Sequence, residues 1–105
     1  MGFSPVARGR IRWLRPEQGG RPAPPPGPMF ATTARFDNAP FKDSFSLAFR
    51  FVSPSDADLS QDVEVAILAL DLVKEHLGTG VTLVVLEGFE VIGYFQVREV
   101  LDMRK

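Results

Sequence analysis

Hydrophobic and polar residues alternate at every second position in several short segments of the chain. Residues 8–14 (RGRIRWL) place three arginines on one face and apolar or small side chains on the other. Residues 29–36 and 45–51 repeat this pattern, and the second of them alternates four large apolar side chains with small or polar ones. A period of two is that of a half-buried β-strand. The pattern therefore predicts three strands in the first half of the chain.

Two further β-rich segments, residues 81–87 and 91–101, lie on either side of Gly88. Short apolar segments joined across a glycine are typical of a β-hairpin, in which the glycine takes backbone angles that other residues avoid. We therefore expect a hairpin here.

The segment from 62 to 77 fits two structures. Several of its apolar residues lie near helical spacing, and Ser60 is a suitable residue to cap a helix. The same region also alternates as a strand does, and periodicity alone does not decide between them in a segment this apolar. Because the neighbouring segments are all predicted strands, we expect a strand over residues 62–70.

The predicted strands are separated by turns and loops. Residues 22–28 contain five prolines, which neither donate to a sheet nor continue a helix, so we expect an extended and exposed loop. Proline-rich segments also dock on aromatic grooves, but no suitably spaced basic residue flanks this one, and a stiff connection is the preferred interpretation. Residues 37–40 predict a turn, and residues 53–58 an acidic loop.

Five to six strands joined by short turns point to a closed barrel or a sandwich, and so to an all-β fold. The nine phenylalanines alternate inward as core residues do, rather than forming a platform on which nucleic-acid bases stack. The residues expected to be largely buried are Ile11, Trp13, Phe30, Phe45, Leu47, Phe49, Val85 and Phe95.

The composition is that of one small globular domain. The chain has 105 residues, of which 45% are hydrophobic and 24% are charged. It contains no cysteine, which excludes disulfides and thiolate metal sites. The longest apolar run, residues 65–70, is too short to span a membrane, and no secretory signal is visible. We therefore expect no membrane partner and a cytoplasmic location.

Charge is unevenly distributed although the net charge is only −1. Residues 1–50 carry eight basic side chains and three acidic ones, whereas residues 51–105 carry four basic and ten acidic side chains. Such a division can place opposite fields on different faces of one domain. The simpler interpretation is that the two halves interleave in the fold and their charges mix.

No constellation of catalytic residues is visible. His76, the single histidine, has no neighbouring ligand-type partner and is expected to be an exposed turn residue. The carboxylates between Asp56 and Glu64 lack the glycine and the closing glutamate of a calcium loop, and no phosphate-binding glycine loop is present. We therefore expect a protein that is not an enzyme and that holds no cofactor or metal.

The order of the segments resembles the C-terminal domain of elongation factor Tu. Residues 10–21 (RIRWLRPEQGGR) are similar to the opening strand of that domain and its Gly-Gly-Arg turn, and residues 29–33 (MFATT) to its next strand. The similarity continues through residues 72–73, Gly78 and residues 81–93. The resemblance covers residues 8–101 and implies a single six-stranded antiparallel Greek-key barrel. It would occupy residues 8–105, after an N-terminal extension of residues 1–7.

The resemblance also implies contacts with RNA backbone and with other protein domains. Arg21 matches an arginine that lies near transfer RNA phosphates in that family, and Thr33 falls within the matched Thr-Thr pair. Gly93 matches the first glycine of a Val-Gly-Ala-Gly stretch, and Phe95 stands in place of its second glycine, where the family's backbone comes close to the RNA. A bulky ring at Phe95 and the negative charge of Asp71 both oppose a phosphate backbone. GTP hydrolysis is not implied, because the residues that perform it are absent from this chain.

Two functions follow from these observations. The first is a non-catalytic module that binds a protein partner. The alternative is a small domain that binds RNA backbone through an arginine-rich strand face. The candidate contact residues for RNA or a partner are Arg8, Arg10, Arg12, Arg21, Thr33, Arg50 and Gly93. The balanced net charge, Asp71 and Phe95 favour the protein partner.

Overall fold

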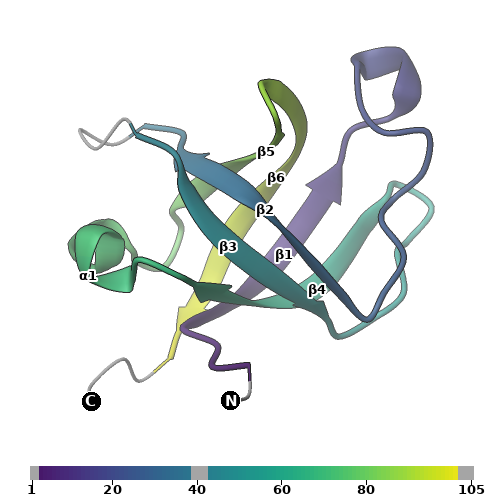
Figure 1. Ribbon diagram of the computed structural model, residues 1–105. Coiled ribbons are helices and arrows are strands. Elements are labelled where there is room, and N and C mark those ends of the chain that lie inside the picture. Colours follow the sequence, from purple (N-terminus) through teal and green to yellow (C-terminus); the bar gives the residue numbers. More distant parts are fainter. Residues whose placement is uncertain (1–2, 39–42, 102–105) are drawn as a thin grey trace.

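The computed structural model describes residues 3–38 and 43–101, which form six strands closed into one antiparallel barrel (Figure 1). The strands run around the barrel in the order β1-β4-β3-β2-β5-β6. They are β1 (Ala7–Trp13), β2 (Met29–Phe36), β3 (Phe45–Phe51), β4 (Ser60–Ile67), β5 (Thr82–Glu87) and β6 (Glu90–Val100). The predicted all-β, six-stranded antiparallel barrel is confirmed, and its Greek-key connectivity stays a prediction.

The first three predicted strands form where alternation placed them. In β1 the buried positions alternate with Arg8, Arg10 and Arg12, as expected. The barrel begins slightly before Arg8: Val6 and Ala7 are buried, and the backbone N–H of Val6 donates to the carbonyl of Val65 at 2.8 Å. These two residues of the expected extension therefore lie in the barrel.

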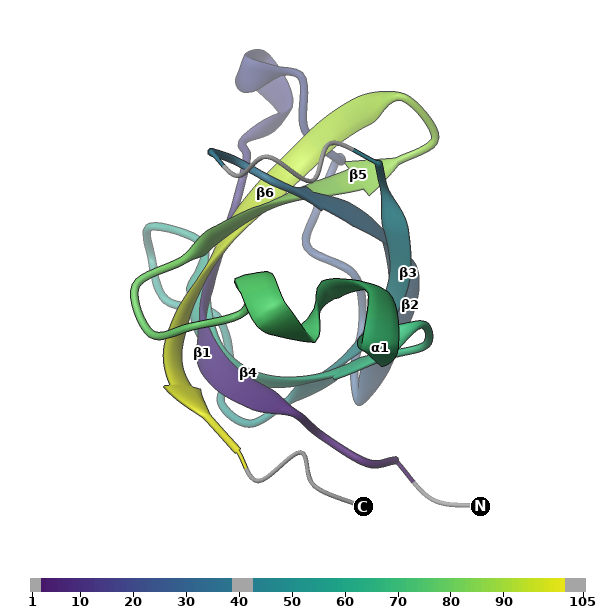
Figure 2. The ribbon, with the colours of Figure 1, turned by 90° about the vertical axis from the view of Figure 1, so that its left-hand side faces the viewer.

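The ambiguous segment divides into a strand and a short helix. The strand prediction is confirmed up to Ile67, where β4 ends. It is wrong for residues 68–70, because the chain turns there and the helix α1 (Leu70–Val73) begins, followed by a 3₁₀ turn at Lys74–His76. α1 lies across one open end of the barrel (Figure 2), and Val73 and Leu77 are buried in the core. The end of the barrel needs an apolar cover, and a helical turn supplies it.

The predicted hairpin is confirmed. β5 and β6 pair from Thr82–Gln96 to Glu87–Glu90, which leaves Gly88 and Phe89 as the two loop residues. Gly88 has φ +64°, the left-handed region that glycine enters without steric cost. Phe89 is fully exposed at the tip.

The core is apolar and filled by inward residues of all six strands. Seven of the eight residues expected to be buried are buried: Ile11, Trp13, Phe45, Leu47, Phe49, Val85 and Phe95. The prediction is wrong for Phe30, which is only partly buried and packs against the core near one end of the barrel.

Trp13 organises the end of the barrel opposite α1. Its ring meets Phe30, Phe49 and Phe51 edge-on, with centroids 6.0 to 6.4 Å apart. Its indole N–H donates to the side-chain oxygen of Gln61 at 2.8 Å, and the Gln61 amide donates to the carbonyl of Ser53. Gln61 is therefore a buried polar residue whose hydrogen bonds are made inside the fold.

The proline-rich segment, residues 22–28, is irregular and mostly exposed, as expected. Pro25 is the exception, because it is buried. Of the turn predicted at residues 37–40, the last two residues lie outside the described part of the chain.

Candidate functional site

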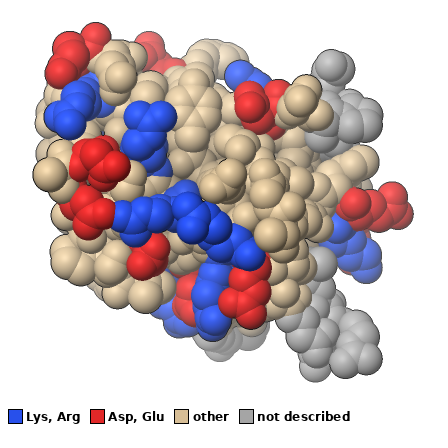
Figure 3. Space-filling view, turned by 180° about the vertical axis from the view of Figure 1, so that it is seen from behind, with Lys and Arg blue, Asp and Glu red and all other residues tan. Residues whose placement is uncertain are grey.

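The arginine row of β1 lies on the outer surface of the barrel, on the side away from β2 and β3 (Figure 2). Seen from behind, this face carries blue basic groups with red acidic groups directly beside them (Figure 3). The two halves of the sequence interleave here, since β1 pairs with β4 on one side and with β6 on the other.

Four of these side chains form a line across four strands, which we call the charge ladder: Arg50, Glu64, Arg8 and Glu99. Each member lies opposite the next in the strand pairing. Glu64 accepts from Arg50 at 2.6 Å and from Arg8 at 3.3 Å, and Arg8 also pairs with Glu99 at 3.2 Å. Opposite charges at paired positions stabilise a sheet.

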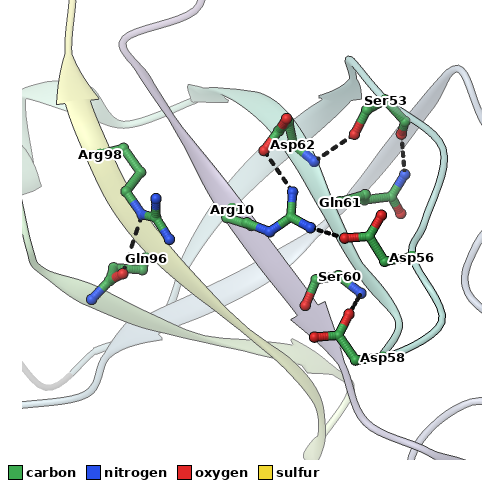
Figure 4. Close-up of polar contacts among 9 residues, drawn as sticks. All are labelled: Arg10, Ser53, Asp56, Asp58, Ser60, Gln61, Asp62, Gln96 and Arg98. Carbon is green, nitrogen blue, oxygen red and sulfur yellow. Dashed lines mark hydrogen bonds and ion pairs between the residues drawn. The ribbon is translucent and has the colours of Figure 1, made fainter.

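Arg10 is also paired with acidic residues. Its guanidinium donates to Asp62 at 2.8 Å and to Asp56, which lies in the acidic loop before β4. Figure 4 shows Arg10 extending from β1 toward these two carboxylates and away from Arg98. The acidic loop predicted at residues 53–58 therefore supplies a counter-charge to the arginine row.

The ion pairs shift the ionisation of both kinds of group. The hydrogen bond from Arg50 holds the pKa of Glu64 below its ordinary value, and Arg8 acts in the same direction. The hydrogen bond to Asp62 raises the pKa of Arg10 above its ordinary value. Each shift favours the charged form, so these groups remain ionised across the neutral range.

This pairing changes what the arginine face can do. Arg8, Arg10 and Arg50 together face four carboxylates: Asp56, Asp62, Glu64 and Glu99. A phosphate backbone would have to displace these carboxylates or lie beside them. Among the described residues, the Arg12 side chain forms no ion pair or hydrogen bond, and the Arg98 side chain donates only to the neutral amide of Gln96.

The other candidate residues do not join this row. Arg21 lies near β2 and β5, where it pairs with Glu87 at 2.8 Å and stacks over the Phe30 ring at 5.4 Å. Thr33 is a half-buried residue of β2, opposite Ser46 and Leu86. The structure therefore gathers Arg8, Arg10, Arg12 and Arg50 on one surface and leaves Arg21 and Thr33 elsewhere.

Gly93 lies on β6 beside the arginine row of β1, but its role is in the packing of the two strands. It is buried, and a Cβ there would come within 2.9 Å of the Arg12 carbonyl oxygen and 3.2 Å of the Trp13 ring. The absence of a side chain lets β6 pack closely on β1 at this point.

The structure places three further residues, and two of the expectations about them, those for Phe95 and His76, need correction. Phe95 is fully buried and points into the core, so it does not obstruct a ligand outside. Asp71 is exposed in α1, and Lys74 lies 3.3 Å from its carboxylate. His76 is half-buried rather than exposed, with its ring 5.7 Å from that of Phe36.

An apolar groove of about 680 Å³ lies on the outer face of β2, β3 and β4. Its floor contains Ala31, Ala48 and Ala66, which lie opposite one another in the strand pairing. Phe3, Met29 and Leu68 also line it, and Met29 and Leu68 are 45% and 84% exposed. Outward positions of a barrel are normally polar, so three alanines in one row are a departure from the pattern.

Arg50 connects the groove with the charge ladder. Its guanidinium stacks on the ring of Phe3, 4.6 Å from the centroid, at the border of the groove. The Arg50 side chain is 43% exposed, whereas that of its partner Glu64 is 13% exposed. The charge presented to solvent beside the groove is therefore positive.

Two searches within the described ranges bear on other kinds of site. Residues 3–38 and 43–101 contain no group of three or more histidine or carboxylate side chains placed to hold a metal ion. The same part of the chain has no helix that is long and apolar enough to cross a membrane.

Neither a scan against models of protein families nor a search of curated proteins finds a match to this chain.

Proposed function

We propose that the protein is a non-catalytic binding module whose apolar groove on β2, β3 and β4 receives a segment of a protein partner. The groove is the observation that carries the proposal. Alanine methyls and exposed Met29 and Leu68 contribute apolar surface that the fold leaves uncovered. Apolar surface of this kind on a small domain marks an interaction site.

The chemistry of the groove indicates what kind of segment it binds. The alanine side chains of its floor are short, which lets the backbone of a partner approach the sheet closely. The apolar walls favour aliphatic or aromatic anchors, and the exposed guanidinium of Arg50 favours a carboxylate next to them. We therefore propose an apolar peptide segment with an acidic residue at one end.

Two other observations support a protein partner over RNA. The resemblance to the C-terminal barrel of elongation factor Tu favours a domain that contacts other protein domains. The RNA alternative loses much of its basis, since Arg8, Arg10 and Arg21 each bond to a carboxylate. Neutralised arginines contribute little to the release of counterions that drives phosphate binding.

The test is a selection of short random peptides displayed on phage against the folded protein. We expect enriched peptides that share apolar anchors and a flanking acidic residue. Their binding should be lost in Ala48→Lys, because the new side chain fills the floor of the groove. The matched control is Ala57→Lys, which adds the same charge at an exposed loop position and should bind normally.

Two results would contradict the proposal. One is that no peptide is enriched over background. The other is that selected peptides bind Ala48→Lys as tightly as the unaltered protein while circular dichroism shows both to be folded.

A further inference from the structure

Arg12 and Arg98 border a cleft of about 260 Å³ on the outer surface, formed by β4, β1, β6 and β5. We call it the anion cleft. The other described residues that line it include Arg10, Ser60, Thr82, Tyr94 and Gln96, and none of the described lining residues is a carboxylate. It lies on the β1 side of the barrel and shares no lining residue with the apolar groove.

The cleft carries net positive charge, whereas the charges around it are paired with opposite charges. Arg10 also lines the cleft but is engaged by Asp56 and Asp62, and Arg8 in the same row is engaged by Glu64 and Glu99. Arg12 follows in the same row, but its paired positions are Ser60 on β4 and Tyr94 on β6, neither of which is acidic. Arg12 is therefore the one member of the β1 row that the described part of the fold leaves without a counter-charge.

Arg98 supplies a second cation on β6. Its Nε donates to the Gln96 side-chain oxygen at 3.2 Å, a neutral partner that orients the guanidinium without cancelling its charge. In Figure 4 this guanidinium extends into the space between β6 and β1. The polar side chains of Thr82, Tyr94 and Gln96 add hydrogen-bonding groups around the same cleft.

We propose that the anion cleft binds a phosphate monoester group. Two guanidiniums without carboxylate partners match the charge of a dianion, and each presents a planar set of donors suited to tetrahedral phosphate oxygens. A ligand with a single carboxylate would neutralise only one of the two cations. The volume is several times the roughly 30 Å³ share of one water molecule, so it also has room for the atoms that carry the phosphate.

Two sources of this group share the same chemistry: a small phosphorylated molecule and a phosphorylated side chain of a protein. The experiment has one arm for each. Isothermal titration of the full chain with inorganic phosphate, at constant ionic strength set with chloride, measures the group alone. Titration with a phosphoserine peptide and its unphosphorylated form measures the contribution of a protein context.

We expect saturable binding of inorganic phosphate that weakens about tenfold or more in Arg12→Gln and in Arg98→Gln, as loss of a charge-assisted hydrogen bond predicts. Arg15→Gln is the matched control, because Arg15 is exposed, outside the cleft and without a carboxylate partner. Binding of the phosphoserine peptide should strengthen as pH rises through about 6, where the monoester gains its second charge.

The two arms separate the sources. Tighter binding of the phosphopeptide than of inorganic phosphate assigns the cleft to a phosphorylated protein, and equal binding assigns it to small phosphate compounds. The proposal is overturned if no phosphate binds, or if Arg12→Gln and Arg98→Gln bind as the unaltered protein does. It is also overturned if a short RNA with hydroxyl ends binds more tightly than either monoester and depends on the same arginines.

Discussion

The outer surface of the barrel has two faces that differ in whether their outward side chains have partners within the fold. On the face of β4, β1 and β6, most charges find a partner of opposite sign on the neighbouring strand. On the face of β2, β3 and β4, the groove of Ala31, Ala48 and Ala66 is left open by the described residues. Both faces cover the same core, so closing the barrel requires neither the ion pairs of the first face nor the open groove of the second.

On the first face most side chains have partners within the fold, whereas on the second face the apolar side chains have none among the described residues. Ion pairs across strands stabilise the pairing and reduce what the arginines offer to an outside ligand. The uncovered methyls of the groove, and the unpaired cations Arg12 and Arg98, are the exceptions on their respective faces. We propose that these exceptions are the binding sites of the molecule.

The largest expected effect is on the core that supports both faces. Phe49 is fully buried in β3, between the ring of Trp13 and that of Phe95. Phe49→Ala should lower the free energy of unfolding by about 3–5 kcal/mol, because it leaves a cavity among these rings. Phe89→Ala is the control, since the fully exposed hairpin residue should leave the urea midpoint unchanged. Equal effects of the two changes would contradict the assignment of inward and outward positions.

A smaller effect is expected where β6 packs on β1. Gly93→Ala places a methyl group within 2.9 Å of the Arg12 carbonyl and should cost about 1–3 kcal/mol in urea unfolding. Gly78→Ala is the matched control, because a Cβ there meets no atom within 4 Å. A stable Gly93→Ala protein would show that the strands do not approach this closely.

Within the charge ladder, Glu64 should contribute most. Its carboxylate is 13% exposed and bonds to two arginines, so Glu64→Gln should cost about 1 kcal/mol at neutral pH. Glu99→Gln should cost less, because Glu99 is 57% exposed and pairs with one arginine.

The Glu64 contribution should also depend on pH. The folded pKa of Glu64 is lowered, mainly by its hydrogen bond to Arg50, so its contribution is fully present above the unfolded pKa of about 4.3. It is lost as pH falls through the folded pKa. Unfolding curves of the unaltered protein and of Glu64→Gln should therefore converge in acid, and a constant difference down to low pH would contradict this account.

The smallest effect concerns RNA. A fluorescently labelled single-stranded RNA with hydroxyl ends should show no measurable binding by anisotropy near physiological salt. The reason is that three of the arginines on this surface form ion pairs with carboxylates. Micromolar or tighter binding that weakens in Arg8→Gln and Arg10→Gln would restore the RNA alternative.

The sequence predicted the strands well because alternation is a local property. Residues 8–14 and 45–51 each contain enough inward and outward positions to identify a half-buried strand without knowing its neighbours. The limit appears at residues 68–70, where an apolar run continues although the strand has ended. Nothing in that run distinguishes a sheet residue from one that turns to cover the end of the barrel.

Gln61 shows a signal that was present and missed. Val63, Val65 and Ile67 alternate inward, so extending the same alternation backward places Gln61 inside with them. The indole N–H of Trp13, also inward, then needs a buried acceptor, and Gln61 provides one.

The candidate site could be predicted only in part, because pairing between strands is not local. Alternation placed Arg8 outside, but the carboxylate that binds it belongs to Glu64, 56 residues later in the chain. The groove has the same origin, since its three alanines become one surface only in the observed register. A partial signal existed: alanine occupies an outward position in each of three predicted strands.

The most direct test of the central claim asks which face a protein partner contacts. Isotope-labelled protein would be titrated with a peptide from the selection, and backbone amide shifts followed by NMR. The account predicts that the largest shifts fall on Ala31, Ala48, Ala66 and Leu68, with little change at Arg8, Arg10 and Arg12. Shifts centred on the β1 arginines, with the groove amides unmoved, would contradict it.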